Sequence, residues 1–104
     1  MSASSPSLPI AFVAKIVAAP GRAEELGALL TGAVELANQE PGTIVWFAVR
    51  SDADTFWIFD AFPDRVSRDE HAEGAIVAAL SENAELLAGE PEINPADVLA
   101  MKMP

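Results

Sequence analysis

The sequence predicts a small α+β domain whose elements follow the order βαββαβ, and it predicts that two copies of the domain associate. Three observations support this prediction. The chain has 104 residues, about the size of one domain, and 51% of them are apolar, which suffices for a packed core. Short segments rich in β-branched and aromatic residues alternate with longer segments whose apolar residues recur every three or four positions. Two of the short segments are apolar on both faces.

Turns and helix-ending residues separate the predicted elements. Pro20-Gly21 and Pro41-Gly42 bound the first helix, and residues 51–54 form the turn of a hairpin. Asp64 is expected to cap the second helical region, and Gly74 to interrupt it. In chain order, we expect a strand at residues 10–18, a helix at 22–38, strands at 43–50 and 55–62, a helical region at 64–89 and a fourth strand at 98–103. This order is the ferredoxin-like arrangement, a four-stranded antiparallel sheet with two helices on one face.

The hairpin of the second and third strands indicates why a partner is needed. Successive residues of a strand point to opposite faces of the sheet. On the third strand, Phe56, Ile58, Asp60 and Phe62 share one face, and Trp57, Phe59 and Ala61 share the other. Two helices cover only one face, so the other would expose a larger apolar patch than monomers usually tolerate. A second copy packed sheet against sheet is the simplest cover. The alternative is a single domain whose C-terminal segment folds over the open face.

The net charge of −10 bears on the class of partner. Sixteen acidic and six basic side chains create a field that repels nucleic acid and anionic membranes. Residues 1–7 contain neither a basic nor a hydrophobic segment, so no signal peptide is expected there. We expect a flexible tail at residues 1–9, a single domain at residues 10–104 and a cytoplasmic protein.

The reactive side chains exclude several classes of enzyme. The chain has no cysteine, no tyrosine and one histidine, so one chain offers neither a thiol nucleophile nor the usual Cys/His zinc site. Neither of the common glycine-rich phosphate-binding loops is present. We therefore expect no metal site and no nucleotide-phosphate site of these types.

Two polar residues at and after the end of the third strand are the candidates for chemistry. His71 is the only side chain that titrates near neutral pH without a large shift, although it also fits a surface or capping role. Asp60 is a carboxylate in an otherwise apolar strand, and its burial would require a partner. Arg50 on the neighbouring strand and His71 on the following helix are the partners that the sequence offers. It does not distinguish between them.

The aromatic residues of the two hairpin strands have two interpretations. They are either core and interface residues or the wall of a pocket for a planar ligand. The residues concerned are Trp46, Phe47, Trp57 and Phe59. For any one of them, a core or interface role is favoured.

The stretch from the third strand to the next helix resembles the antibiotic biosynthesis monooxygenase family of dimeric α/β-barrel proteins. Members of that family show an acidic residue, an aromatic residue two positions later, a second acidic residue two further on, and then a histidine on the helix. In this chain those residues are Asp60, Phe62, Asp64 and His71. The turn at residues 40–43 is similar as well. The family commonly has Glu and Tyr where this chain has Asp60 and Phe62.

The resemblance implies a fold and an activity. The fold would be a dimeric α/β barrel. The activity would be oxidation by O₂ of an electron-rich aromatic, such as a quinol or an anthrone, without a metal, flavin or other cofactor. By this resemblance His71 and Asp60 would be catalytic, with His71 accepting or sharing a proton and Asp60 orienting it. The partner would be a hydrophobic aromatic small molecule bound against Trp46, Trp57, Phe59 and Phe62.

Two rival functions stay open at this point. Haem-degrading proteins of the same fold use an asparagine on the first strand, which residues 10–18 lack, and haem propionates would meet a very acidic protein. A non-enzymatic dimer that binds or sequesters a small molecule would bind ligands without consuming oxygen.

Overall fold

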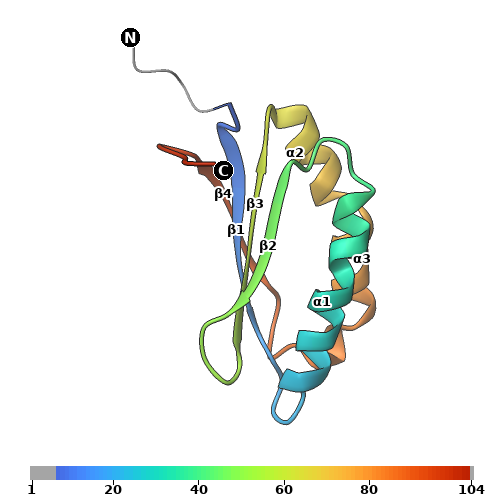
Figure 1. The fold of residues 1–104 in the computed structure, drawn as a ribbon. Helices are drawn as coiled ribbons and strands as arrows, with labels where there is room; N and C mark the ends of the chain where they lie inside the picture. The colour runs from blue at the N-terminus through green and yellow to red at the C-terminus, as the bar shows by residue number, and fades with distance from the viewer. Residues whose placement is uncertain (1–6, 104) are drawn as a thin grey trace.

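The structure, a computed structural model, describes residues 7–103 and places its helices on one side of a four-stranded sheet (Figure 1). In chain order the elements are β1 (Ile10–Val17), α1 (Ala23–Asn38), β2 (Val45–Arg50), β3 (Thr55–Phe62), α2 (Arg65–Ala72), α3 (Ala75–Glu82), the short 3₁₀ helix η1 (Ala84–Leu86) and β4 (Glu92–Asp97). The predicted α+β class and ferredoxin-like order are confirmed. The second helical region is divided before α3, whose N-cap is Gly74. Within the described residues, no helix has the length and apolar character needed to cross a membrane.

The sheet has the strand order β2-β3-β1-β4, and every neighbouring pair is antiparallel. The central strands are therefore β1 and β3. Their register places Phe12 of β1 opposite Asp60 of β3, and Trp46 of β2 lies opposite Asp60 on the other side. Side chains at directly opposed positions share a face, so Phe12, Asp60 and Trp46 form one row across three strands. We call these three residues the cross-strand row.

The fourth strand does not lie where the sequence placed it. The prediction of residues 98–103 is wrong, because β4 pairs with β1 over Glu92–Asp97 and its last residue lies opposite Ile10. The residue before β1 is Pro9, which has no N–H to donate to a longer ladder. The pairing therefore continues by one hydrogen bond only, which Val98 N–H donates to the Pro9 carbonyl at 2.9 Å. A proline within β4 is tolerated because β4 is an edge strand.

The main core lies between the sheet and α1. Ile16, Phe56 and Ile58 point from the sheet toward Leu26 and Leu30 of α1, and each of the five is at most 5% exposed. Burial of large apolar side chains contributes about 25 cal/mol for each Å² removed from water, so this cluster fixes α1 on the sheet. Farther along the same face, the apolar core gives way to two buried polar residues, Asp60 and His71.

The opposite face of the sheet, which we call the outer face, is apolar and largely uncovered. Phe47, Val49 and Phe59 are 59%, 52% and 38% exposed. They alternate along β2 and β3 with residues that point toward the helices, as the predicted alternation of faces requires. The helices lie on the other side of the sheet (Figure 1). These three side chains are therefore in contact with solvent.

The C-terminal segment covers only one end of the outer face. Ala11 and Ala61 are buried there together with Leu8, and Val98 and Met101 pack against them. The C-terminal segment therefore covers the outer face at that end only, and the alternative in which it covers the whole open face is not what the structure shows. Of the predicted tail at residues 1–9, residues 1–6 lie outside the described residues, and Leu8 belongs to this buried cluster.

Candidate functional site

Asp60 and His71 form a buried pair between the sheet and α2. His71 Nε2 lies 2.8 Å from Asp60 Oδ2, and the two residues are 6% and 1% exposed. Asp60 projects from β3 on the helix-facing side, and His71 stands in the last turn of α2, which packs on β1 and β3. The sequence left two partners open for Asp60, and in the structure Asp60 pairs with His71. Arg50 bonds to Glu24 and to the Ala53 carbonyl instead.

Glu40 holds the other side of the His71 ring. Its Oε1 lies 2.5 Å from His71 Nδ1, and it also accepts a hydrogen bond from the Thr43 hydroxyl at 2.7 Å. Glu40 follows the end of α1 and opens the turn that leads into β2, which the Thr43 N–H closes by donating to the Glu40 carbonyl at 3.1 Å. The Glu40 side chain is 21% exposed, so the cluster reaches the surface at this end.

The two carboxylates favour the charged form of His71. Burial lowers the pKa of the imidazole, but the hydrogen bonds that the ring donates to Asp60 and Glu40 and the charges of both carboxylates raise it, and the net pKa lies above its ordinary value of 6.5. Ionised carboxylates only accept hydrogen bonds, so two such contacts require both ring nitrogens to donate. The arrangement of the two carboxylates around the ring therefore favours the imidazolium form of His71.

Local sequence features position the cluster. Asp64 caps α2 by accepting a hydrogen bond from Ser67 N–H at 2.8 Å, and this bond lowers the pKa of the Asp64 carboxyl. The predicted cap is thus confirmed, and it sets the start of the helix that carries His71. Gly74 leaves room for Glu40, because a Cβ at that position would lie 2.9 Å from Glu40 Oε2.

A groove of about 490 Å³ opens beside this cluster. Glu40, Thr43 and His71 line it together with Ser67 and Gly74. Asp60 lies behind His71 and does not line this groove. The groove therefore gives solvent access to the Glu40 end of the cluster.

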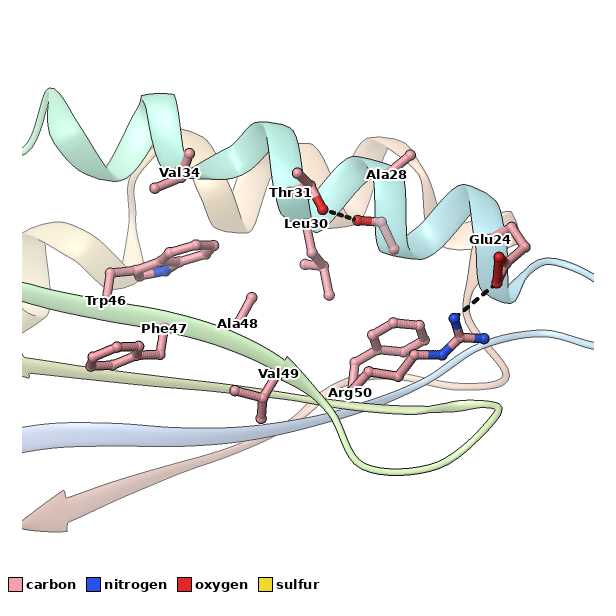
Figure 2. A pocket seen from close by; sticks show the side chains of 12 residues that line it. Glu24, Ala28, Leu30, Thr31, Val34, Trp46, Phe47, Ala48, Val49 and Arg50 are labelled. Atoms are coloured by element: carbon pink, nitrogen blue, oxygen red, sulfur yellow. Dashed lines mark hydrogen bonds and ion pairs between the residues drawn. The ribbon is translucent and has the colours of Figure 1, made fainter.

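A second groove, of about 610 Å³, lies between α1 and the edge strand β2 (Figure 2). Trp46 stands at one end of it, and the Arg50–Glu24 ion pair closes the other, with a distance of 2.9 Å between the charged atoms. Leu30 and Phe56 form part of its apolar lining. Trp46 therefore belongs both to this groove and to the cross-strand row that contains Asp60.

Aromatic rings surround the His71 imidazole on the β1 side. The Phe62 ring centroid lies 5.3 Å from that of His71, and the Phe12 centroid lies 6.5 Å away. Phe12 and Phe62 contact one another edge to face at 6.0 Å. The guanidinium carbon of Arg68 lies 5.3 Å from the Phe12 ring centroid. The polar pair thus lies in an aromatic setting with one cation at its edge.

Among the described residues, three buried side-chain atoms have no hydrogen-bond partner: Trp46 Nε1, Asp60 Oδ1 and Arg68 Nε. Buried polar atoms are usually paired, so such atoms mark positions of functional interest. Two of them belong to the cross-strand row, and Arg68 lies over its third member, Phe12. They comprise one acceptor and two donors.

The structure separates the predicted site residues into two groups. His71, Asp60 and Phe62 lie together, and Trp46 stands beside Asp60 on the same face of the sheet. Trp57 and Phe59 lie on the outer face and are not brought to His71. Trp57 instead donates to the Ser51 hydroxyl at 2.8 Å and contacts Lys15, whose Nζ lies 5.8 Å from the ring centroid.

Sequence reasoning did not identify Glu40, Thr43 or Arg68 as site residues. Glu40 and Thr43 lie about thirty positions before His71, and only the resemblance of their turn drew attention to them. The spacing of Arg68 and His71, three positions apart on one helix, was a usable signal, because such residues share a helix face.

The arrangement suits proton transfer better than binding of a metal ion. Asp60 and Glu40 contact opposite nitrogens of one ring, so their carboxylates cannot converge with that ring on a single ion. A chain of carboxylate, imidazole and carboxylate, buried at one end and exposed at the other, can instead move a proton between the interior and solvent.

Comparisons with known proteins place the chain in a family. The crystal structure of NE2512 from Nitrosomonas europaea, described as a protein of unknown function, is 40% identical, with a TM-score of 0.91, and the match covers 94% of this chain and 96% of that one. PA3566 from Pseudomonas aeruginosa is 28% identical, with a TM-score of 0.76 and coverage of 90% and 97%. Rv0793 from Mycobacterium tuberculosis is 22% identical, with a TM-score of 0.79 and coverage of 91% and 99%, which supports the fold alone.

Among curated proteins, none matches the chain significantly. The family description that matches is "Antibiotic biosynthesis monooxygenase", over residues 9–83, which is well over half of the chain. The protein therefore belongs to the antibiotic biosynthesis monooxygenase family.

Proposed function

We propose that the protein is a cofactor-independent monooxygenase that oxidises a quinol- or anthrone-like aromatic molecule with O₂. For an anthrone, one atom of O₂ replaces the two hydrogens of the ring methylene group, and the other leaves with those hydrogens as water. The step that the protein must assist is removal of a proton, because the deprotonated aromatic can pass an electron to O₂ directly. Family membership supports the reaction class.

The observation that carries the proposal is Asp60, a carboxylate 1% exposed with Oδ2 on His71 and Oδ1 without a partner. Oδ1 is the atom on which a substrate proton would arrive. As Asp60 gains that proton, the His71 imidazolium loses one of its two counter-charges, and its Nδ1 proton can pass to Glu40. Glu40 lines a groove open to solvent and can release the proton there. His71 is thus proposed as the proton-transfer group, acting through Asp60.

We also propose that the protein works as a homodimer joined through the outer face. The exposed Phe47, Val49 and Phe59 on that face support this, because a sheet surface of this kind is stabilised by burial against a second copy. Trp57 and Phe59 would then lie inside the barrel between the two sheets. Trp46 and Phe62 would stay with Asp60 on the helix side of each subunit.

The test of the activity is oxygen uptake with a panel of quinols and anthrones. The natural chain should consume oxygen with at least one of them, and Asp60→Asn and His71→Gln should each slow it by about a hundredfold or more, the usual contribution of general acid–base groups. Asp69→Asn, which removes an exposed carboxylate on the same helix as His71, should leave the rate unchanged. Equal rates for all variants would remove the role assigned to Asp60 and His71.

A non-enzymatic ligand-binding dimer is the second candidate, and one observation favours it. Both ring nitrogens of His71 are engaged by carboxylates, as in a purely structural cluster. Under this alternative an aromatic ligand binds, but oxygen concentration stays constant with every quinol and anthrone tested. That result would overturn the monooxygenase proposal.

A further inference from the structure

The turn between α1 and β2 lies close along one side of the helical region that carries His71. Gly42 of this turn lies beside Ser67, because a Cβ added at Gly42 would be 2.6 Å from Ser67 Oγ. Glu40 bonds to His71, four positions after Ser67 on the same face of α2. Glu40 Oε2 would in turn be 2.9 Å from a Cβ added at Gly74. The backbone of the turn is therefore held beside the His71 ring.

Thr43 closes this turn with two hydrogen bonds to the same residue. Its N–H donates to the Glu40 carbonyl at 3.1 Å, and its hydroxyl donates to Glu40 Oε1 at 2.7 Å. The backbone bond closes the turn, whereas the side-chain bond fixes the place of the Glu40 carboxylate. The two bonds have different donors, so a substitution that removes only the hydroxyl separates their effects.

Two donors converge on Glu40 Oε1. One is the Thr43 hydroxyl, and the other is His71 Nδ1 at 2.5 Å. A carboxylate oxygen has two lone pairs, so both are in use. The Thr43 oxygen itself lies 3.4 Å from His71 Nδ1, which is longer than an ordinary N–H···O bond. Thr43 therefore acts on the ring through Glu40 and not by a direct bond.

The Glu40 carboxylate lies where it needs such a restraint. Its side chain has three rotatable bonds, is 21% exposed and lines the groove of about 490 Å³ that opens to solvent. Water competes for the carboxylate there, and ordering a flexible side chain costs entropy. On the other side of the ring, the Asp60 side chain is 2% exposed and is held by burial. The contact at His71 Nδ1 is thus the one that depends on an added hydrogen bond.

Other charged groups near the ring do not duplicate Glu40. Among the described residues, Asp60 and Glu40 are the carboxylates that pair with His71, at opposite nitrogens. Glu70 of α2 lines the same groove without an ion pair to the ring. Arg68 of α2 lies over the Phe12 ring on the β1 side. If Glu40 turns away, no second carboxylate of the described residues is already in place at Nδ1.

We propose that Thr43 is a positioning residue, whose hydroxyl holds Glu40 Oε1 against His71 Nδ1 and so maintains the hydrogen-bonded path from the ring to solvent. The importance of this path for turnover rests on the proposed function, because a proton passes from Nδ1 to Glu40 only while the two atoms are within hydrogen-bond distance. The effect of Thr43 on the ring itself depends on no reaction.

The test is an NMR titration of His71 in Thr43→Val, which replaces the hydroxyl with a methyl group and keeps the backbone bond of the turn. The pKa of His71 should fall, because a Glu40 carboxylate that turns to solvent stabilises the imidazolium less, while burial still lowers the pKa. Thr43→Ser keeps a hydroxyl and should titrate like the natural chain. Thr31→Val is the matched control, since the Thr31 hydroxyl donates to the Gly27 carbonyl within α1 at 2.8 Å. It should leave the titration unchanged.

A double-mutant cycle tests whether Thr43 acts through Glu40. Glu40→Ala should lower the pKa of His71 by itself, and adding Thr43→Val to it should produce no further fall. An equal fall with and without Glu40 would show a direct action of Thr43 and overturn the inference. An unchanged titration in Thr43→Val would overturn it as well. Thr43→Ala removes the same hydroxyl with a smaller side chain and takes the place of Thr43→Val if that variant does not fold.

The titration needs no substrate, so its outcome is separable from that of the proposed function. A fall of the His71 pKa in Thr43→Val without oxygen uptake by the natural chain would sustain the role of Thr43 and remove the monooxygenase activity. Oxygen uptake by the natural chain together with an unchanged titration in Thr43→Val would sustain the activity and remove the role of Thr43.

Discussion

His71 Nε2 and Asp60 Oδ2 lie 2.8 Å apart, and together the two side chains replace the apolar core over part of the helix-facing side of the sheet. An unpaired carboxylate would be costly at this depth. A protonated His71 ring balances the charge of Asp60, and Glu40 on the other side of the ring stabilises that protonated form. The three groups join β3, α2 and the turn before β2, so the charge state of one ring is linked to the packing of three segments.

The pKa of His71 should be measurable directly, because it is the only histidine in the chain and its ring protons give a unique NMR signal. The titration of the natural chain should show a pKa above 6.5. Asp60→Asn removes one of the two hydrogen-bonded negative charges that raise the pKa of His71. Burial of the ring, which lowers the pKa, is then opposed only by Glu40. The pKa of His71 should therefore fall in that variant, and an unchanged titration would contradict the ion pair.

Stability should depend on pH through the same residue. Because the pKa of His71 is higher in the folded state than its ordinary value of 6.5, its contribution is fully present below pH 6.5 and is lost as pH rises through the folded value. Each unit between the two pKa values corresponds to about 1.4 kcal/mol. Urea unfolding of the natural chain and of His71→Gln should differ most at the acidic end of this window. A difference that grows with pH would reverse the assignment.

Gly74 should control the Glu40 contact. An added Cβ would lie 2.9 Å from Glu40 Oε2 and 3.2 Å from the His71 carbonyl, and the flexible carboxylate is the group that yields. Gly74→Ala should therefore lower the pKa of His71 by weakening its bond to Glu40. Gly32→Ala is the matched control, since nothing lies within 4 Å of its Cβ and it sits inside α1. It should stabilise the fold by about 0.5–1 kcal/mol and leave the titration of His71 unchanged.

The contrast between β3 and β4 shows what the sequence carries about the fold. Residues 55–62 are β-branched or aromatic at most positions, and both their strand bounds and the face shared by Phe56, Ile58, Asp60 and Phe62 are confirmed. β4 contains Asn94 and Pro95 and is a strand only because β1 offers an open edge to it. Local strand propensity therefore predicts an element such as β3, whose residues themselves favour a strand. It fails for an element such as β4, which becomes a strand only by pairing with a neighbouring strand.

The candidate site was predictable in part for a similar reason. The position of Asp60 within an apolar strand indicated a buried carboxylate that needs a partner. That the partner is His71 and not Arg50 depends on where α2 lies on the sheet. Glu40 reaches His71 only because the chain turns back after α1 and again before α2. Contacts between side chains so far apart in sequence depend on the topology of the fold, and short sequence patterns do not predict that topology.

The outer face should control association. Phe47→Lys places a charge on the exposed apolar surface of β2, at a residue 59% exposed, where a sheet-to-sheet interface would have to bury it unpaired. Sedimentation at micromolar concentration should give about twice the chain mass of 10.9 kDa for the natural protein and the single chain mass for this variant. Val66→Lys makes the same change at a residue 67% exposed on α2, on the other side of the sheet, and should remain dimeric. If the natural chain sediments as a monomer, or if Phe47→Lys leaves the dimer intact, the outer face is not the interface.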